Sequence, residues 1–154
     1  MIEIRKLNEK DIELANDLLK CWGIVQDKPQ APSNKRSSLP IKERLSDINF
    51  HVLVAINKGK VVGGLTAYTL PIFTKDETEL FLYEIETLEN HRREGIATML
   101  IDRLKQLCNE LKVRTIFLCT DLENEAAQAL YANTGGHRET VALYTYELSG
   151  NSRD

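Results

Sequence analysis

The sequence has few cysteines, no long hydrophobic run and no leader-like beginning. Its three cysteines, Cys21, Cys108 and Cys119, show neither paired nor metal-like spacing, so we expect free thiols, no disulfide framework and no metal site. No apolar run reaches the roughly 18 residues that a membrane span needs. The first residues, "MIEIRKLNEKDIELA", lack the basic-then-apolar layout of a signal peptide. These absences predict a cytoplasmic protein with no membrane partner.

The chain also lacks an excess of positive charge. Its 20 lysines and arginines are outnumbered by 23 aspartates and glutamates, which gives a net charge of −3 and argues against nucleic acid as a partner. With 154 residues and 42% hydrophobic content, it has enough apolar residues for one core and too many for a disordered chain. We expect a single domain over residues 1–150 and a short tail at 151–154.

Apolar spacing at the beginning of the chain predicts a strand and then a helix. "IEIRKL" (2–7) alternates apolar and polar residues, which is typical of a strand. We expect Asn8 to cap the following helix, with Asp11 three residues on and apolar side chains at helical spacing as far as Trp22. Residues 26–40 are rich in proline, serine and charge, and predict a long loop of the kind that often forms a lid or a binding loop.

A short helix at 41–48 should precede a β-rich region. The runs at 50–56 and 60–72 predict two strands, and the "NKGK" between them is a hairpin signal. Gly63-Gly64 inside the second run predicts a bulge or a close approach of two backbones. "ELFLYEIETL" (79–88) is the next expected strand.

The second half predicts two helices and two strands. A long amphipathic helix (96–111) should lead into a buried strand at "RTIFLCT" (114–120). Asn124 should cap a helix that ends at Gly135-Gly136. A last strand should cover "VALYTYEL" (141–148). The strand–helix–strand unit makes two strands parallel, so we expect an α/β (α+β) fold in which helices flank a mixed central sheet. Four side chains of the last strand should share one face: Ala142, Tyr144, Tyr146 and Leu148.

The stretch "RREGIAT" (92–98) opens directly into the long helix. A helix start presents unpaired backbone N–H groups and a partial positive charge, which attract phosphate. Gly95 lets the backbone approach closely without a Cβ, Ala97 is small, and Arg92 and Arg93 add positive charge. The alternative is an ordinary dibasic surface turn. The position of this turn, after a strand and before a long helix, favours a pyrophosphate site.

A second motif lies in "ENEAAQALYANTGG" (123–136), which by itself fits any capped amphipathic helix. In this order and separation, the two segments resemble the GNAT superfamily of acetyl-CoA-dependent N-acetyltransferases. The turn R/Q-x-x-G-x-G/A of that family is met by Arg92, Gly95 and Ala97. Its helix motif N-x-x-A-x-x-L-Y is met by Asn124, Ala127, Leu130 and Tyr131.

The resemblance implies the GNAT fold, with acetyl-CoA entering the gap between the strand of Glu84 and the strand of Thr115. It also implies which residues bind the cofactor. They lie at the end of the strand that contains Glu84, in the turn at 92–98 with the helix start that follows it, and at the start of the helix capped by Asn124. These are Ile85, Glu86, Thr87, Arg92, Arg93, Glu94, Gly95, Ile96, Ala97, Thr98, Asn124 and Ala127.

A closer likeness covers roughly residues 50–148. "VVG…AY-x-LP-x-F" (61–73) and "HRR-x-GIAT" (91–98) are similar to the type I aminoglycoside 3-N-acetyltransferases. This likeness implies a small polycationic amine as substrate, the 3-amino group of an aminoglycoside as the acceptor, and antibiotic resistance as a role. Enzymes of this kind are often dimers, so a homodimer is one arrangement that the likeness allows.

Glu84 and Glu86 are the expected contacts of the acceptor amine. If Ile85 points into the core, both glutamates point to the opposite face of the strand; a solvated strand face is the alternative. Similar enzymes place an aspartate where this chain has Glu84. Direct proton transfer from a lysine-like amine (pKa ~10.4) to an ordinary glutamate (pKa ~4.3) is uphill by about six pKa units, or roughly 8 kcal/mol. We therefore expect Glu84 to bind the cation and relay its proton, with Glu86 assisting.

The resemblance also implies a catalytic role for Tyr131, as proton donor to the departing sulfur. A strand N–H near Glu86 or Thr87 is the expected donor to the developing oxyanion. Tyr83 and Asp121, together with the two glutamates, are expected to contact the substrate. For Asp121, capping the next turn is an equal alternative.

The leading hypothesis is thus an acetyl-CoA-dependent N-acetyltransferase that acts on an aminoglycoside. Two alternatives remain: acetylation of another amine, such as a polyamine, an amino-sugar or a peptide N-terminus, and a non-catalytic sensor that binds acyl-CoA. Release of thiol from acetyl-CoA in the presence of candidate amines separates an enzyme from a sensor.

Overall fold

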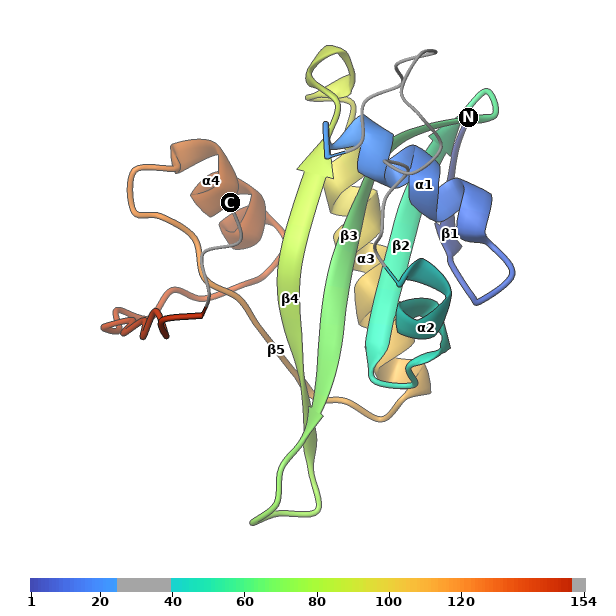
Figure 1. Ribbon diagram of the computed structural model, residues 1–154. Helices are drawn as coiled ribbons and strands as arrows, with labels where there is room; N and C mark the ends of the chain where they lie inside the picture. The colour runs from blue at the N-terminus through green and yellow to red at the C-terminus, as the bar shows by residue number, and fades with distance from the viewer. Residues whose placement is uncertain (25–39, 151–154) are drawn as a thin grey trace.

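A computed structural model describes residues 1–24 and 40–150 of the protein (Figure 1). Its centre is a five-stranded sheet in the order β1-β2-β3-β4-β5, in which the first four strands are antiparallel and β4 and β5 are parallel. The predicted mixed sheet is therefore confirmed. The strands are β1 (Ile2–Lys6), β2 (Phe50–Asn57), β3 (Lys60–Pro71), β4 (Thr78–Thr87) and β5 (Thr115–Phe117).

Helices cover both faces of the sheet. Figure 1 shows α1 (Ile12–Cys21) and α2 (Ile41–Ser46) in front of it and α3 (Ile96–Glu110) behind it. A short 3₁₀ helix, η2 (Glu89–His91), joins β4 to the start of α3. The last helix, α4 (Glu125–Asn133), lies to the side of β4, beyond β5. Among the described residues, no helix combines the length and the apolar character that crossing a bilayer requires.

The main core lies between the sheet and α3. Leu100, Leu104 and Leu107 follow one another at helical spacing, and all three are almost completely buried against β-strand side chains such as Leu80 and Leu82. Burial of one such side chain contributes roughly 1.5–3 kcal/mol. A second apolar cluster lies on the other face, under α1 and α2. The start of α3 is thereby held in a fixed position at the end of β4.

Two glycines let neighbouring elements approach closely in β3. A Cβ at Gly63 would lie 2.9 Å from the carbonyl oxygen of Glu86 in β4, and a Cβ at Gly64 would lie 2.6 Å from Leu18 in α1. The close approach predicted for this pair is confirmed. The sheet has a register shift near it as well, between Ala55 and Ile56 of β2. Gly63 thus lets β3 pack tightly against the part of β4 that carries the glutamates.

A β-bulge in β4 decides which side chains face which side. Leu82 pairs with Ala67 and Glu84 pairs with Thr66, so Tyr83 is an extra residue without a partner in β3. Leu80 and Leu82 point into the core beneath α3, and a regular strand would send Glu84 into the same core two residues later. Because of the bulge, Ile85 packs against that core instead, and Glu84 and Glu86 lie on the face that α1 and α2 cover.

The structure corrects the predicted start of the first helix. Asn8 does not cap it: the helix begins at Ile12, after Asp11. The Asp11 carboxylate accepts a hydrogen bond from the Asn8 backbone N–H, while the Asn8 side chain accepts one from Lys10 N–H. Asn8 therefore organises the turn that precedes the helix. The predicted loop at 26–40 lies outside the described residues except for Pro40, and the tail at 151–154 lies outside them entirely.

Two predictions for the last third of the chain are also wrong. The strand at 114–120 is shorter than expected, spanning only Thr115–Phe117. It is not buried, because it forms the edge of the described sheet and pairs with β4 alone among the described strands. The strand expected at 141–148 does not form within the described chain. Its residues have the alternation of a strand, but no other described strand lies beside them to accept or donate backbone hydrogen bonds.

Candidate active site

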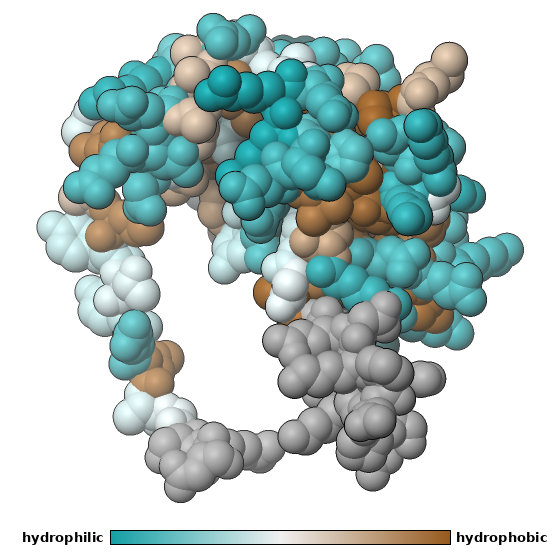
Figure 2. Space-filling view, turned by 90° about the horizontal axis from the view of Figure 1, so that it is seen from above, coloured by the Kyte–Doolittle hydropathy of each residue, from teal (hydrophilic) through white to brown (hydrophobic). Residues whose placement is uncertain are grey.

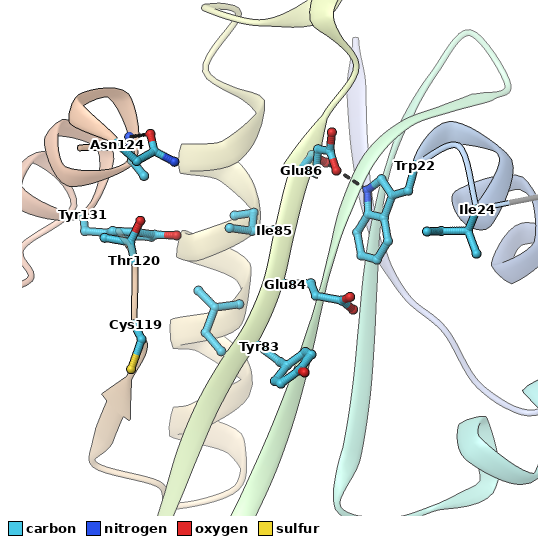
Figure 3. A pocket seen from close by; sticks show the side chains of 12 residues that line it. Trp22, Ile24, Tyr83, Glu84, Ile85, Glu86, Cys119, Thr120, Asn124 and Tyr131 are labelled. Atoms are coloured by element: carbon cyan, nitrogen blue, oxygen red, sulfur yellow. Dashed lines mark hydrogen bonds between the residues drawn. The ribbon is translucent and has the colours of Figure 1, made fainter. Parts of the chain in front are cut away.

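A cleft of about 330 Å³ opens where β4 continues past the end of β5. The two strands pair over only three residues, Glu79 to Phe81 of β4 with Thr115 to Phe117 of β5. Beyond that point β4 runs on to Thr87 and is no longer paired on this side. The cleft is lined by Trp22, Ile24, Leu82, Tyr83, Glu84, Ile85, Glu86, Cys119, Thr120, Asn124, Ala127 and Tyr131 (Figure 3).

On one side of β4 the cleft is acidic and aromatic. Figure 3 shows Glu84 and Glu86 pointing toward Trp22, away from α4. Thr66, which is almost completely buried, donates a hydrogen bond from Oγ1 to Glu84 Oε2 at 2.9 Å. Both glutamates are exposed. The hydrogen bond from Thr66 holds one carboxylate oxygen of Glu84, a residue that lines the cleft.

Trp22 forms the wall opposite the glutamates. Its indole N–H donates to the backbone carbonyl oxygen of Glu86 at 3.3 Å, so the end of α1 is tied to β4 across the sheet. Burial, and then the negative charge of Glu86, raise the pKa of the neighbouring Cys21 thiol. Cys21 therefore stays protonated and acts as a packing residue. Tyr83 stands beside this wall, with its ring edge-on to Tyr68 at 6.0 Å.

On the other side of β4 the cleft is bounded by α4. Asn124, Ala127 and Tyr131 lie at positions i, i+3 and i+7, which places them on one face of the helix, and all three line the cleft. The Asn124 side chain accepts a hydrogen bond from Ala127 N–H at 3.1 Å, as the motif predicts for a helix cap. Figure 3 shows the Tyr131 ring directed toward Ile85 on β4.

Tyr131 is held in place from both ends of its helix. Gly136 N–H donates to the Tyr131 carbonyl and Gly135 N–H to that of Ala132, which closes the helix at the predicted glycine pair. The ring packs against the main core. Burial raises the pKa of the phenol, so Tyr131 keeps its proton through neutral and mildly alkaline pH. Among the described residues its hydroxyl has no hydrogen-bond partner.

The turn before α3 combines a left-handed glycine, unpaired backbone N–H groups and two arginines. Gly95 has φ 76°, in the left-handed region, and the space where its Cβ would lie is open. The first hydrogen bond of the helix runs from Met99 N–H to Gly95 O, so the three N–H groups before it stay unpaired within the described structure. Arg92 and Arg93 are exposed, and in the same described part they make no ion pair. Unpaired N–H donors, the positive charge of two arginines and open space beside Gly95 therefore lie close together at this turn.

Some predicted site residues lie apart from the cleft. Glu94 receives a contact from His91 Nδ1 at 3.1 Å, which braces the turn. Thr87 points to the glycine of β3, and its Oγ1 is buried without a described partner. Asp121 lines a neighbouring hollow together with Leu122, Glu123 and Asn124, outside the main cleft. The roles predicted for these residues, and for those that do line the cleft, stay predictions.

Several cleft residues were not predicted from the sequence. Thr66 is 18 residues from Glu84 and meets it only through strand pairing. Trp22 was expected on the apolar face of α1, and its hydrogen bond to β4 had no signal in the sequence. Ile24, Cys119 and Thr120 line the cleft because of where α1 and β5 end. Within the described residues, no cluster of histidine, cysteine and acidic side chains could hold a metal ion.

Comparison with solved structures gives two similar proteins from uncultured soil metagenomic samples. An aminoglycoside acetyltransferase, HMB0005, is 31% identical with a TM-score of 0.84, and the match covers 97% of this chain and 99% of that one. A second, meta-AAC0020, was solved in complex with sisomicin and is 26% identical with a TM-score of 0.82, over 96% and 97% of the two chains.

A curated relative from Arabidopsis thaliana, GCN5-related N-acetyltransferase 4, chloroplastic, is 32% identical over 94 residues. The match covers 56% of this chain and 32% of the relative, so the chain spans about a third of that protein's length. The model of the acetyltransferase (GNAT) family matches residues 12–135, from the start of α1 to the glycine that closes α4. This match includes the turn at Gly95 and the helix of Tyr131, and it shows that the chain belongs to the acetyltransferase (GNAT) family.

Proposed function

We propose that this protein transfers the acetyl group of acetyl-CoA to an amino group of a small polycationic acceptor, with the 3-amino group of an aminoglycoside as the leading target. The observation that carries the proposal is that β4 runs through the cleft and separates two different side chains. A carboxylate held by Thr66 lies on one side of the strand, and a protonated tyrosine lies on the other. Acetyl transfer needs a carboxylate that takes a proton from the attacking amine and a proton donor for the departing thiolate. These two side chains must lie on opposite sides of the reacting carbonyl.

The residues at the start of α3 fit the cofactor that the family uses, which is acetyl-CoA. Its pyrophosphate would be held by the unpaired N–H groups after Gly95, with Arg92 and Arg93 adding positive charge. Asn124 and Ala127 bound the cleft on the way from this turn to Tyr131. The cofactor supplies the acetyl group as a thioester, which is already activated for attack by an amine.

Glu84 and Glu86 are suited to hold the acceptor. Two carboxylates beside the aromatic rings of Trp22 and Tyr83 attract a cation and offer a flat apolar surface to a sugar ring. Because Glu84 is exposed, a proton taken from the ammonium can pass on to water. Glu84 thus binds the amine as a cation and relays its proton, and Thr66 keeps the carboxylate in position for both steps.

Tyr131 is suited to return a proton to the departing sulfur. Burial raises the pKa of its phenol, so the proton is available at the pH at which the amine is partly neutral. The backbone N–H of Glu86 or Thr87, at the unpaired end of β4, would donate to the carbonyl oxygen as negative charge develops on it. A covalent role for cysteine is not needed, and Cys108 is buried with its pKa raised to about 11 by that burial.

The choice of an aminoglycoside rests on two supports. The motifs at 61–73 and 91–98 are similar to those of the type I 3-N-acetyltransferases. The similar structures HMB0005 and meta-AAC0020 are aminoglycoside acetyltransferases, and the second was solved with sisomicin. Resistance to the antibiotic would follow from this choice of substrate, either as a selected role or as a side activity.

The decisive experiment is a screen of thiol release from acetyl-CoA over several amine classes. We expect turnover with aminoglycosides that carry a free 3-amino group and little turnover with analogues that lack it. Polyamines, amino-sugars and peptide N-termini serve as competing substrates. Turnover with one of these amines alone would show that it, and not an aminoglycoside, is the acceptor. Tight binding of coenzyme A without turnover on any amine would favour a sensor.

Gly95→Asp should weaken binding of coenzyme A by roughly tenfold or more. The new carboxylate would occupy the positive end of α3 and repel the pyrophosphate. The matched control is Gly59→Asp in the β2–β3 hairpin, because Gly59 has φ 77° against 76° for Gly95, and neither Cβ meets a neighbour. Both variants place an aspartate at nearly the same positive φ, and isothermal titration calorimetry compares their affinities for coenzyme A with that of the wild type. If Gly95→Asp and the wild type bound coenzyme A with equal affinity, the pyrophosphate would not bind at this turn.

Glu84→Gln should lower kcat/KM for the acceptor roughly tenfold to hundredfold at neutral pH. Glutamine keeps the size of the side chain and can still accept the hydrogen bond from Thr66, so only the charge and the proton relay are lost. Glu79→Gln on the same strand, before the bulge, is the control and should retain wild-type activity. Steady-state kinetics across pH measures both variants. Full activity of Glu84→Gln over the whole pH range would show that this carboxylate has no catalytic role.

Tyr131→Phe should lower kcat by about tenfold or more while leaving KM for acetyl-CoA nearly unchanged. The phenyl ring keeps the packing against the core, and only the donor hydroxyl is removed. Tyr68→Phe removes a hydroxyl outside the cleft and should have no effect on kcat. Unchanged turnover in Tyr131→Phe would leave Tyr131 with a packing role only.

A further inference from the structure

The side chain of Trp22 makes a hydrogen bond to the backbone of β4 that the proposed mechanism does not use. Its indole N–H donates to the carbonyl oxygen of Glu86 at 3.3 Å, from the end of α1 (Figure 3). The two residues are 64 positions apart in the sequence, and Trp22 is the only tryptophan of the chain. The contact therefore exists only because the fold brings two distant segments together.

The end of α1 holds the backbone of Trp22 in a fixed position. Gly23, with φ 72°, donates its N–H to the carbonyl oxygen of Lys20. The N–H of Ile24 donates to the carbonyl oxygen of Leu19. This pair of hydrogen bonds is the arrangement in which a left-handed glycine closes a helix. The backbone is thus ordered on both sides of Trp22, so little conformational entropy remains to be lost when its side chain contacts β4.

The two adjacent glycines of β3 make room for this contact. A Cβ at Gly64 would lie 2.6 Å from the Leu18 side chain, so this glycine lets α1 lie close to the sheet. A Cβ at Gly63 would lie 2.9 Å from the carbonyl oxygen of Glu86, which is the acceptor of the indole hydrogen bond. A side chain at either position would therefore displace the donor or the acceptor of that hydrogen bond.

The end of β4 lies in a polar part of the surface. Figure 2 looks down on this end of the molecule and shows mainly hydrophilic side chains, with hydrophobic ones visible between them. A backbone carbonyl near such a surface can accept hydrogen bonds from water, which approaches from many directions. The indole of Trp22 approaches from one direction only, because α1 carries it. Its hydrogen bond therefore contributes more to the orientation of the carbonyl than to stability.

The carbonyl of Glu86 and the N–H of Thr87 belong to one planar trans peptide unit, in which the two groups point in opposite directions. The carbonyl points toward β3 and Trp22, so the N–H of Thr87 points away from them. The next N–H along the chain, that of Leu88, donates to the Val62 carbonyl oxygen of β3 at 2.8 Å, as the alternation of a strand requires. The N–H of Thr87 therefore lies on the edge of β4 that β5 leaves unpaired within the described sheet.

We propose that Trp22 is a positioning residue, which holds the Glu86–Thr87 peptide unit so that the N–H of Thr87 is directed at the thioester end of acetyl-CoA. This inference rests on the acetyl transfer proposed above. Without the indole hydrogen bond, the peptide unit can rotate about its flanking bonds, and its N–H loses its alignment with the cofactor. A donor at the carbonyl also polarises the peptide and strengthens the N–H as a donor. Trp22 thus acts on the cofactor from the acceptor side of β4, through the backbone.

The single indole N–H allows a direct test on the wild-type protein. After isotopic labelling of nitrogen, the chain gives one tryptophan side-chain resonance, which is followed while acetyl-CoA is added in the absence of any amine. We expect the resonance to shift on binding, because a new hydrogen bond at the N–H of the peptide unit changes the acceptor strength of its carbonyl. Calorimetry measures the binding itself.

The outcomes of this titration separate the inference from the proposed function. Acetyl-CoA that binds without moving the indole resonance would overturn the positioning role of Trp22 and leave the proposed function intact. Acetyl-CoA that does not bind at all would overturn the proposed function, and the positioning role with it.

Trp22→Phe provides the kinetic test, with Trp22→Ala for comparison. Phenylalanine removes the N–H and keeps an aromatic ring beside the acceptor, so kcat/KM for acetyl-CoA should fall roughly threefold to tenfold while KM for the acceptor amine stays nearly unchanged. Alanine removes both, so it should show the same loss for acetyl-CoA and also a raised KM for the amine. Circular dichroism checks that both variants are folded. If Trp22→Phe kept the wild-type kcat/KM for acetyl-CoA, or changed only the KM for the amine, Trp22 would be a wall of the acceptor site without a positioning role.

Discussion

The extra residue at Tyr83 is the constraint on which the rest of the site depends. Before it, β4 buries Leu80 and Leu82 under α3, and after it the strand buries Ile85 on that same side. A regular alternation would drive two carboxylates into an apolar core, where an unpaired charge costs several kcal/mol. The bulge lets one strand fill the core along its whole length and still present Glu84 and Glu86 to the cleft.

This arrangement places a negatively charged region and a positively charged region on opposite sides of one strand, β4. The carboxylates face α1 and favour a cation, while the start of α3 has free N–H groups and two arginines that favour an anion. Negative and positive groups of side chains therefore lie in the same protein without cancelling each other. The glycines of β3 make this possible, because Gly63 and Gly64 let β4 and α1 pack tightly against the strand that holds Thr66.

Local patterns of the sequence were sufficient to predict most of the elements. The Lys58-Gly59 turn has both residues at positive φ, as the hairpin signal requires, and α3 begins at Ile96, where the apolar spacing begins. The bulge at Tyr83 was not predicted, because an extra residue leaves no mark on the strand that contains it. The Thr66–Glu84 contact depends on that register. Asp11 stands at the N-cap position that was predicted for Asn8, and its carboxylate binds the Asn8 N–H rather than the first turn of the helix. The predicted strand at 141–148 shows the general limit: propensity specifies what a segment can form, and only a partner determines whether it forms.

The two walls of the cleft differ in how they are stabilised. The wall of β4 belongs to a sheet with a buried core on both faces. The wall of α4 rests on fewer contacts: the ring of Tyr131 against the core, its capped ends, and a hydrogen bond from the Lys105 ammonium to the Thr134 carbonyl. A ligand that contacts both walls would stabilise the position of α4 by the free energy of its contacts with that helix. The position of the Tyr131 hydroxyl therefore depends on the few contacts that hold α4 against the core.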